Sequence, residues 1–403
     1  MLRHNRLKHF MVFALSSATL SPLFAHAEDT GPSFEVYGFA MVDYVQDFKR
    51  VNPAWEDTLR PSKIPTVAGQ YGSDGQATIT PKQSRLGVQG NIPVEGQPLF
   101  TKFEFDWFGV GADEGKVTPR LRHAYGQWGQ WLAGQTHSLF MDIDVFPNVT
   151  DYWGPAGMVF LRNPQIRWTP MSGDRSFAIA IERPTNDLDP GVLREVDPAF
   201  GANVQVDEKL PDLTAQFRQK TGFGHVQLAG ILRRLGYDTT GNFDSSPKGK
   251  TVGWGFDLSS SIALRDYDKI LLSGVYGRGV ASYMNDGGTD LAPDGTLGAP
   301  QASAVPLFGL MAYYEHPWSE HWNSTIGYSR TQVENRSLQA GGAFHSGEYA
   351  SANILYLPSK SILMGAEFLW GRRKDNDGNQ GNDVRTQISF KYSFSSKDLL
   401  SKS

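Results

Sequence analysis

The chain has 403 residues, of which 40% are hydrophobic, and its 38 basic and 42 acidic residues give a net charge of −4. A slightly acidic chain with no run of basic residues is a poor candidate for nucleic-acid binding. The absence of cysteine excludes disulfides and cysteine-ligated metals. The 43 glycines, together with 24 Phe, 15 Tyr and 10 Trp, are typical of many short strands joined by tight turns.

Residues 1–27 have the three parts of a secretory signal peptide. Three basic residues lie within the first eight positions, residues 10–24 are mostly apolar, and "AHA" then matches a small-x-small cleavage site. We expect cleavage after Ala27, because the apolar stretch is too short for the alternative, a membrane anchor. The mature chain would carry 35 basic and 42 acidic residues, for a net charge of −7.

Downstream of the signal peptide, no stretch approaches about 18 uninterrupted apolar residues, which excludes helical membrane spans. Alternation takes the place of long apolar runs. In "LFTKFEFDWF", which begins at Leu99, apolar residues share one face while Lys102, Glu104 and Asp106 share the other. "VRTQISFKYSF" at residues 384–394 alternates in the same way. A period of two residues indicates strands with one apolar and one wet face.

Segments of this kind recur along the chain and predict about 16 strands. They lie at residues 34–47, 78–91, 99–108, 117–128, 131–137, 163–169, 176–183, 211–220, 225–237, 251–263, 269–283, 305–316, 321–335, 343–357, 361–372 and 384–394.

The connections between these strands alternate strictly between long and short. "FKRVNPAWEDTLRPSKIPTVAGQYGSDGQ" at 48–76 is long, whereas "GQ" at 129–130 and "PMSGD" at 170–174 are tight turns. Repeated long loops without structure argue against a compact soluble domain. Outer-membrane barrels, in contrast, have short periplasmic turns, long external loops and both termini on the short-turn side, which requires an even number of strands.

The alternative to a membrane barrel is a large soluble β-sandwich or propeller, whose strands need an apolar, dry core. The faces that would point inward here carry charges that are untenable unless water reaches them. These residues are Lys102, Glu104, Asp106, Arg120, Arg122, Arg167, Arg385 and Lys391. The sequence therefore predicts an all-β, water-filled transmembrane antiparallel β-barrel at 28–394, followed by a short tail at 395–403.

One segment, "GQTHSLFMDIDVFPNVTDYWGPAGMVFLRNPQIRW" at 134–168, follows neither period in its middle. Its loop is too apolar to lie in solvent and is rich in turn residues. We expect it to fold inward after the fifth strand and to narrow the lumen. Asp142, Asp144 and Asp151 would then bring negative charge to the constriction.

Positive charge comes from the predicted wall strands. "QSRLG", "RLRHAY" and "NPQIRW" place Arg85, Arg120, Arg122 and Arg167 on inward faces. Rings of arginines at a narrow part of a pore favour anions, and a guanidinium grips a carboxylate in two-pronged geometry. In the alternative reading, these arginines pair with Glu104, Asp106 and the loop acids and only hold the loop in place.

The chain resembles the DcaP-like family of Gram-negative porins. The resemblance rests on "FEVYGFAMVDYVQDFKRVNPAWEDTLRPSKIP", "KQSRLGVQG", "FEFDWFGVG", "RLRHAYGQWG", the whole segment at 134–168 and "AIERPTNDLDPG". It implies a trimeric, 16-stranded outer-membrane channel for small anionic organic solutes, dicarboxylates among them. It also implies that the eyelet residues are Arg85, Arg120, Arg122, Arg162, Arg167, Asp142, Asp144 and Asp151. The chain departs from some members in lacking a helical extension before the barrel, and it runs nine residues past Phe394.

We therefore expect a passive outer-membrane porin with an arginine-lined constriction for small anionic solutes, in contact with membrane lipid and lipopolysaccharide. The alternatives are a general diffusion porin without solute preference and a plugged surface or structural barrel. The sequence has no GxSxG elbow and no histidines at metal-site spacing, so we expect no enzyme activity, no metal and no cofactor.

Overall fold

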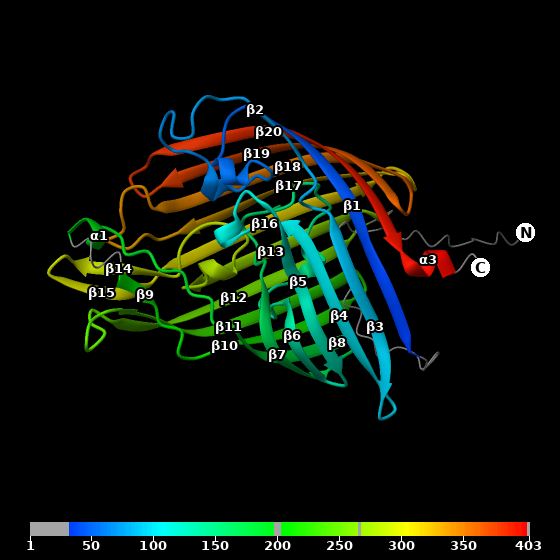
Figure 1. Ribbon diagram of the computed structural model, residues 1–403, viewed down its shortest axis with the longest axis horizontal. Coiled ribbons are helices and arrows are strands. Elements are labelled where there is room, and N and C mark those ends of the chain that lie inside the picture. The colour runs from blue at the N-terminus through cyan, green and yellow to red at the C-terminus, as the bar shows by residue number, and fades with distance from the viewer. Residues whose placement is uncertain (1–31, 197–202, 265–266, 401–403) are drawn as a thin grey trace, which may run out of the picture.

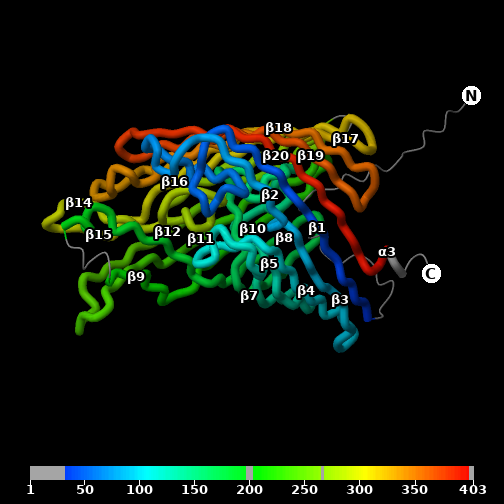
Figure 2. Tube along the Cα trace, turned by 45° about the horizontal axis from the view of Figure 1, so that its top comes forward, coloured from blue at the N-terminus to red at the C-terminus, as the bar shows by residue number. Residues whose placement is uncertain are grey.

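The computed structural model of the chain describes residues 32–196, 203–264 and 267–400, and the predicted signal peptide lies outside these ranges. The described strands form one antiparallel sheet that curls into a closed barrel, with a separate two-stranded hairpin (Figure 1). Figure 2 shows helix α3 (Ser396–Leu400) near one end of the barrel and the hairpin at the other.

The strands have the following bounds: β1 (Ser33–Asp47), β2 (Gln76–Thr80), β3 (Arg85–Val94), β4 (Gln97–Phe108), β5 (Val117–Trp128), β6 (Trp131–His137), β7 (Arg162–Met171), β8 (Arg175–Glu182), β9 (Val204–Val206), β10 (Asp212–Thr221), β11 (Gly224–Thr239), β12 (Gly249–Ala263), β13 (Lys269–Arg278), β14 (Leu291–Thr296), β15 (Ala299–Ala304), β16 (Pro306–Pro317), β17 (Trp322–Val333), β18 (Phe344–Ser359), β19 (Ile362–Asp375) and β20 (Gln380–Ser395). The described helices are short: η1 (Pro53–Trp55), η2 (Pro61–Lys63), η3 (Gly111–Asp113), η4 (Ile143–Val145), α1 (Leu193–Val196), η6 (Ala281–Tyr283) and α3.

Closure of the barrel comes from pairing of the first strand with the last. β1 and β20 run antiparallel in continuous register from Tyr37↔Ser395 to Asp47↔Arg385. On its other side β1 pairs with both β2 and β3, and β11 pairs with both β9 and β10, so each of these two pairs forms one interrupted barrel strand. The 18 described strands of the sheet therefore occupy 16 positions, which confirms the predicted count.

Two expectations from the sequence need correction. The strand predicted at 269–283 ends at Arg278, because Gly279 adopts a positive φ of 64° and the next residues form η6. The long segments at 184–210 and 284–304 were expected to be irregular, but they contain β9 and the β14–β15 hairpin. β20 continues through Ser395, and the expected tail begins with α3.

The outer face of the barrel is apolar. On β11 and β12, Leu228, Leu232 and Phe256 are about half exposed, whereas their neighbours Ala229 and Asp257 point inward and are buried. Since cross-strand partners share a face of a sheet, this alternation continues around the wall. A broad apolar exterior around a polar interior is the pattern of a lipid-facing barrel. In the described part of the chain, no helix is long and apolar enough to cross a bilayer.

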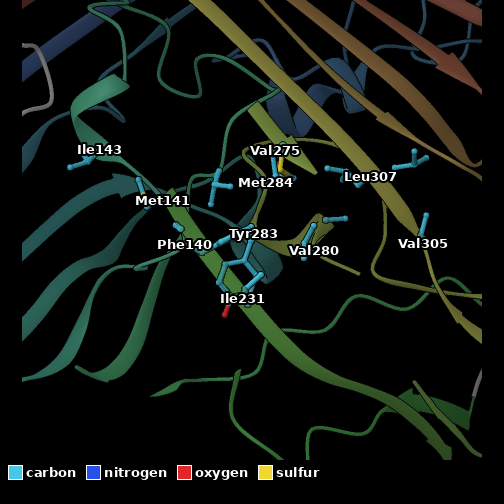
Figure 3. Packing of buried hydrophobic residues seen from close by; sticks show 14 of the residues in the cluster. Phe140, Met141, Ile143, Ile231, Val275, Val280, Tyr283, Met284, Val305 and Leu307 are labelled. Atoms are coloured by element: carbon cyan, nitrogen blue, oxygen red, sulfur yellow. The ribbon is translucent and has the colours of Figure 1, made fainter. Parts of the chain in front are cut away.

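The interior is filled by three loops that fold inward, L1 (48–75), L3 (138–161) and L6 (279–305). One hydrophobic cluster packs Phe140 and Met141 of L3 against Ile231 and Val275 of the wall and Tyr283 of L6 (Figure 3). A second cluster joins further L3 residues to L1 and to the neighbouring wall strands β16, β18 and β19, and it contains Val145, Val149, Met158, Leu59, Ile64, Met311, Tyr349 and Leu369. L3 therefore lies inside the barrel, as the sequence predicted, but L1 and L6 lie beside it.

A charge placed on the outer face should destabilise the barrel. We expect Leu228→Arg to lower the free energy of unfolding by about 2–4 kcal/mol, because the guanidinium would sit in hydrocarbon. Urea unfolding of the protein in lipid vesicles measures this change. Leu297→Arg, at the exposed tip of the β14–β15 hairpin, is the control and should have little effect. Equal stability of both variants would contradict a lipid-facing position for Leu228.

Candidate functional site

L3 is held in the lumen by carboxylates and amides of the barrel wall. Glu367 of β19 accepts hydrogen bonds from Thr150 N (2.5 Å), Thr150 Oγ1 (2.6 Å) and Asp151 N (3.0 Å). Gln83 and Gln387 each donate to the Thr150 carbonyl at 2.8 Å. Buried backbone groups need such partners where no neighbouring strand supplies them. The wall side chains therefore replace the hydrogen bonds that a regular strand would have made.

Asp142 and Asp144 anchor the other side of L3. Asp142 is buried and accepts from His225 Nε2 of β11 at 2.6 Å and from Ser259 Oγ of β12 at 2.8 Å. Asp144 forms an ion pair with Arg218 of β10. Burial tends to raise the pKa of Asp142, but the hydrogen bond and charge of His225, together with Arg218 and Ser259, outweigh it and lower the pKa. These two acids bind the wall away from the predicted arginines.

Asp151 holds L3 against L1. Its carboxylate accepts hydrogen bonds from Thr58 Oγ1 (2.6 Å), Leu59 N (3.0 Å), Gly154 N (3.1 Å) and Tyr349 Oη (3.1 Å). Burial is the largest influence on this carboxyl and raises its pKa, although these donors oppose that effect. The donors are neutral groups, so Asp151 is positioned by hydrogen bonds and not by an arginine.

A cation between two tryptophans links L1, L3 and L6. The guanidinium carbon of Arg60 lies 4.1 Å from the ring centroid of Trp55 and 4.2 Å from that of Trp153. Its Nε donates to Asp286 of L6 at 2.9 Å. Asn285, also on L6, donates to the Trp153 carbonyl at 2.6 Å. Cation–π contacts of this kind strengthen as water is excluded, so the three loops form one linked unit.

A cavity of about 310 Å³ lies between L3 and the wall strands β1, β3, β5, β7 and β20. Five aromatic side chains line it, and they are Phe39, Phe146, Tyr152, Trp153 and Phe160. Among the described residues, five cations and one carboxylate line it, namely Arg85, Arg120, Arg122, Arg162, Lys391 and Asp151. Mostly apolar walls with a few placed charges are typical of small-solute sites. The cavity thus brings together five of the eight predicted eyelet residues.

The two arginines of β5 are neutralised by acids of β4. Arg120 forms a two-pronged ion pair with Asp106, at 3.1 Å from Nε and 2.7 Å from Nη2. Arg122 bridges Glu104 and Asp106, each at 2.8 Å. It also donates to Tyr152 Oη of L3 at 3.0 Å. Breaking such a buried pair on one side leaves an unpaired charge, which is strongly destabilising. These arginines therefore hold Tyr152 and L3 in place while they border the cavity.

Arg85 and Arg162 are less tightly paired. Arg85 lies 3.5 Å from Glu104, which it shares with Arg122, and its guanidinium lies over the ring of Phe39 at 5.1 Å. Arg162, the first residue of β7, lies over Phe160 at 5.1 Å. In the part of the chain that the structure describes, no carboxylate pairs with Arg162, and its Nη1 is buried without a hydrogen-bond partner.

Arg167 lies outside the cavity. Its register partners are Leu132 on β6 and Ala180 on β8, next to the turn that joins Trp131 to β5. Its guanidinium donates to the His137 carbonyl at 2.7 Å and to the Gln165 side chain at 2.9 Å. Neutral hydrogen-bond partners thus fix the position of Arg167 in the wall, near the turn between β5 and β6. Arg167, Asp142 and Asp144 are the three predicted residues that the structure does not bring to the cavity.

Two parts of this site were not predicted from the sequence. Lys391 was recognised as inward-facing but not as a site residue, because its partners on β1 are more than 300 positions away in the chain. L1 was treated as an external loop, although it carries buried Trp55, Leu59 and Ile64. The apolar content that predicted an inward L3 could have predicted the same for L1. Within the described ranges, no group of three or more side chains is arranged to hold a metal ion.

Comparison with known proteins places this barrel in a family. The family model of the DcaP outer membrane protein matches residues 16–394. The chain belongs to this family. It is a family of outer-membrane proteins, so the barrel lies in the outer membrane, with a fold shared by porins and channels. No curated protein matches the chain.

Solved structures show the same fold. The outer membrane channel DcaP of Acinetobacter baumannii is 23% identical, with a TM-score of 0.76 over 91% of this chain and 99% of that chain. A loop L8 deletion mutant of OmpT from Vibrio cholerae is 12% identical, with a TM-score of 0.55 over 90% and 99% of the two chains. A trimer form of OmpT, also 12% identical, has a TM-score of 0.53 over the same shares.

Removing the anchor of L3 should loosen its packing inside the barrel. We expect Glu367→Ala to leave three L3 donors without an acceptor, at a cost of about 1–3 kcal/mol. Single-channel recordings should then show a higher mean conductance and larger current fluctuations than the unmodified protein. Glu320→Ala, in an exposed turn, is the control. Traces of Glu367→Ala that match the control would mean that the hydrophobic clusters alone hold L3.

Proposed function

We propose that this protein is a passive channel that favours small anionic organic solutes, dicarboxylates among them. The observation that carries the proposal is the cavity beside L3, where five cationic side chains meet one carboxylate. Cationic side chains at a constriction attract anions and repel cations, and low-dielectric walls strengthen the effect. Guanidinium groups are also suited to carboxylates by their planar, two-pronged geometry.

The inward charges of β3 and β5 support a role for water and solute in this region. Charged residues are rarely buried unless they are paired or reached by water. Here the exposed fractions of the Arg85 and Arg120 side chains are 16% and 17%, so both are shielded by protein on one side and open toward the cavity on the other. The site is passive in this account, since diffusion requires only attraction and release.

A general diffusion porin is the second candidate, because most of the cavity cations have acidic neighbours. Glu104 and Asp106 offset part of the charge of Arg85, Arg120 and Arg122. If this compensation were complete, the pore would select by size alone. A plugged barrel is the third candidate, since L1, L3 and L6 fill much of the interior.

We also propose a homotrimer embedded in outer-membrane lipid and lipopolysaccharide. The trimer form of the related barrel from Vibrio cholerae supports the oligomeric state, and the broad apolar exterior supports the lipid contact. A trimer should give a native mass of three chains after the detergent contribution is subtracted, as measured by light scattering. A mass of one chain would contradict it.

Reversal potentials test the anion preference. In a KCl gradient across a planar bilayer, the purified protein should give a reversal potential of the sign that indicates chloride preference. Adding succinate to one side should reduce the chloride current, because both anions meet the same cations. A cation-selective reversal potential would refute the proposal, and one near zero would favour the general porin. Failure of succinate and a neutral sugar to swell proteoliposomes would indicate the plugged barrel.

A further inference from the structure

The cationic side chains that line the cavity differ in whether a carboxylate neutralises them. Five cationic side chains line it, whereas three carboxylates either pair with them or line the same space. Two of these acids, Glu104 and Asp106, are within 3.5 Å of arginines. The third, Asp151, is held by neutral donors. Glu104 also pairs with Lys102 at 3.5 Å, so at least two positive charges remain as the local excess.

The unpaired cations are Arg162 and Lys391. Among the described residues, neither has a carboxylate partner, and each lies over a phenylalanine instead. The guanidinium of Arg162 is 5.1 Å from the Phe160 ring, and Lys391 Nζ is 5.0 Å from the Phe39 ring. A cation–π contact orients a cation but leaves its hydrogen-bond donors free. Both side chains can therefore bind an anion without first releasing an internal partner.

Arg162 carries a second sign of an unfilled site. Its Nη1 atom is buried and has no hydrogen-bond partner among the described residues. Arg85 Nε shares this feature, but it lies 3.5 Å from Glu104. A buried guanidinium nitrogen without a partner is costly, and each instance in a folded protein calls for an explanation. A carboxylate in the adjoining cavity would supply the missing acceptor, with a charge-assisted hydrogen bond.

Lys391 extends the site to another part of the wall. It lies on β20 opposite Met41 of β1, and five strands of the barrel separate β20 from β7. Arg85 lies over the same Phe39 ring at 5.1 Å, so two cations flank this aromatic side chain. A solute that moves away from Arg162 inside the cavity is therefore still attracted by a second unpaired cation, Lys391.

We propose that Arg162 and Lys391, and not the paired arginines of β5, bind the solute's carboxylate and set the anion preference. This inference rests on the proposed function and assigns it to two residues. Arg120 and Arg122 remain ion-paired with acids of β4 and act on the solute indirectly, by positioning Tyr152 and L3. Arg85, which shares Glu104, contributes less than the two unpaired cations.

Single substitutions can separate these roles. Arg162→Gln and Lys391→Gln remove one charge each, and neither leaves a carboxylate unpaired, so both barrels should assemble. We expect each to lower the chloride-over-potassium permeability ratio about fivefold, the effect of losing one charge a few ångströms from the ion. The succinate concentration that halves the chloride current should rise by a similar factor. Reversal potentials and succinate titrations in planar bilayers measure both quantities.

Two controls accompany these variants. Lys360→Gln removes the same charge from an exposed turn between β18 and β19 and should leave both quantities unchanged. Arg162→Lys and Lys391→Arg keep the charge and should retain most of the permeability ratio. They also keep the test decisive if a glutamine variant assembles poorly. The succinate concentration that halves the chloride current should then rise more for Arg162→Lys than for Lys391→Arg, because Arg162→Lys loses the planar guanidinium.

The outcomes distinguish this inference from the proposed function. If the unmodified channel prefers anions but both glutamine variants match it, the paired arginines carry the preference and the inference fails alone. If Lys360→Gln has the same effect as Lys391→Gln, overall charge and not a site is responsible, and the inference also fails. If the unmodified channel shows no anion preference and no block by succinate, the proposed function fails with it.

Discussion

The whole structure depends on the pairing of β1 with β20. In hydrocarbon no water is available for backbone N–H and C=O groups, so a sheet that spans the membrane must have no free edge. The continuous register from Tyr37 to Asp47 meets this requirement. Closure then fixes the two faces, since side chains alternate along every strand: apolar residues point to lipid, and Asp43, Glu104, Arg122 and Glu367 are confined to the interior.

A closed ring of 16 strands leaves an interior that side chains alone do not fill, and the inward loops solve this problem in two ways. Their apolar residues form the clusters around Phe140 and Val149, while wall acids such as Glu367 and Glu315 accept the loop backbone hydrogen bonds. Most of the interior charges are therefore structural. What distinguishes the cavity is the sign of its uncompensated charge, which is positive. Elsewhere in the lumen, buried carboxylates such as Asp43, Asp257 and Glu367 are held by neutral hydrogen-bond donors.

The sequence predicted the features that repeat locally and missed those that depend on distant partners. Alternation of period two located the strands, and the apolar content of 138–161 predicted an inward loop, because both signals lie within short windows. The position of Asp142 could not be predicted, since its partners His225 and Ser259 lie 83 and 117 positions away. For the same reason the sequence could show that Arg120, Arg122 and Lys391 face inward, but not which of them keeps an unpaired charge.

Direct observation of a solute in the barrel tests the central claim, that L3 and the wall enclose a cavity with excess positive charge. Bromosuccinate diffused into crystals of the protein would be located by the anomalous scattering of bromine. We expect a bromine peak inside the barrel, within the cavity lined by Arg162 and Lys391. Bromine peaks found only outside this cavity, at a concentration that blocks the chloride current, would contradict the claim of a positively charged solute site.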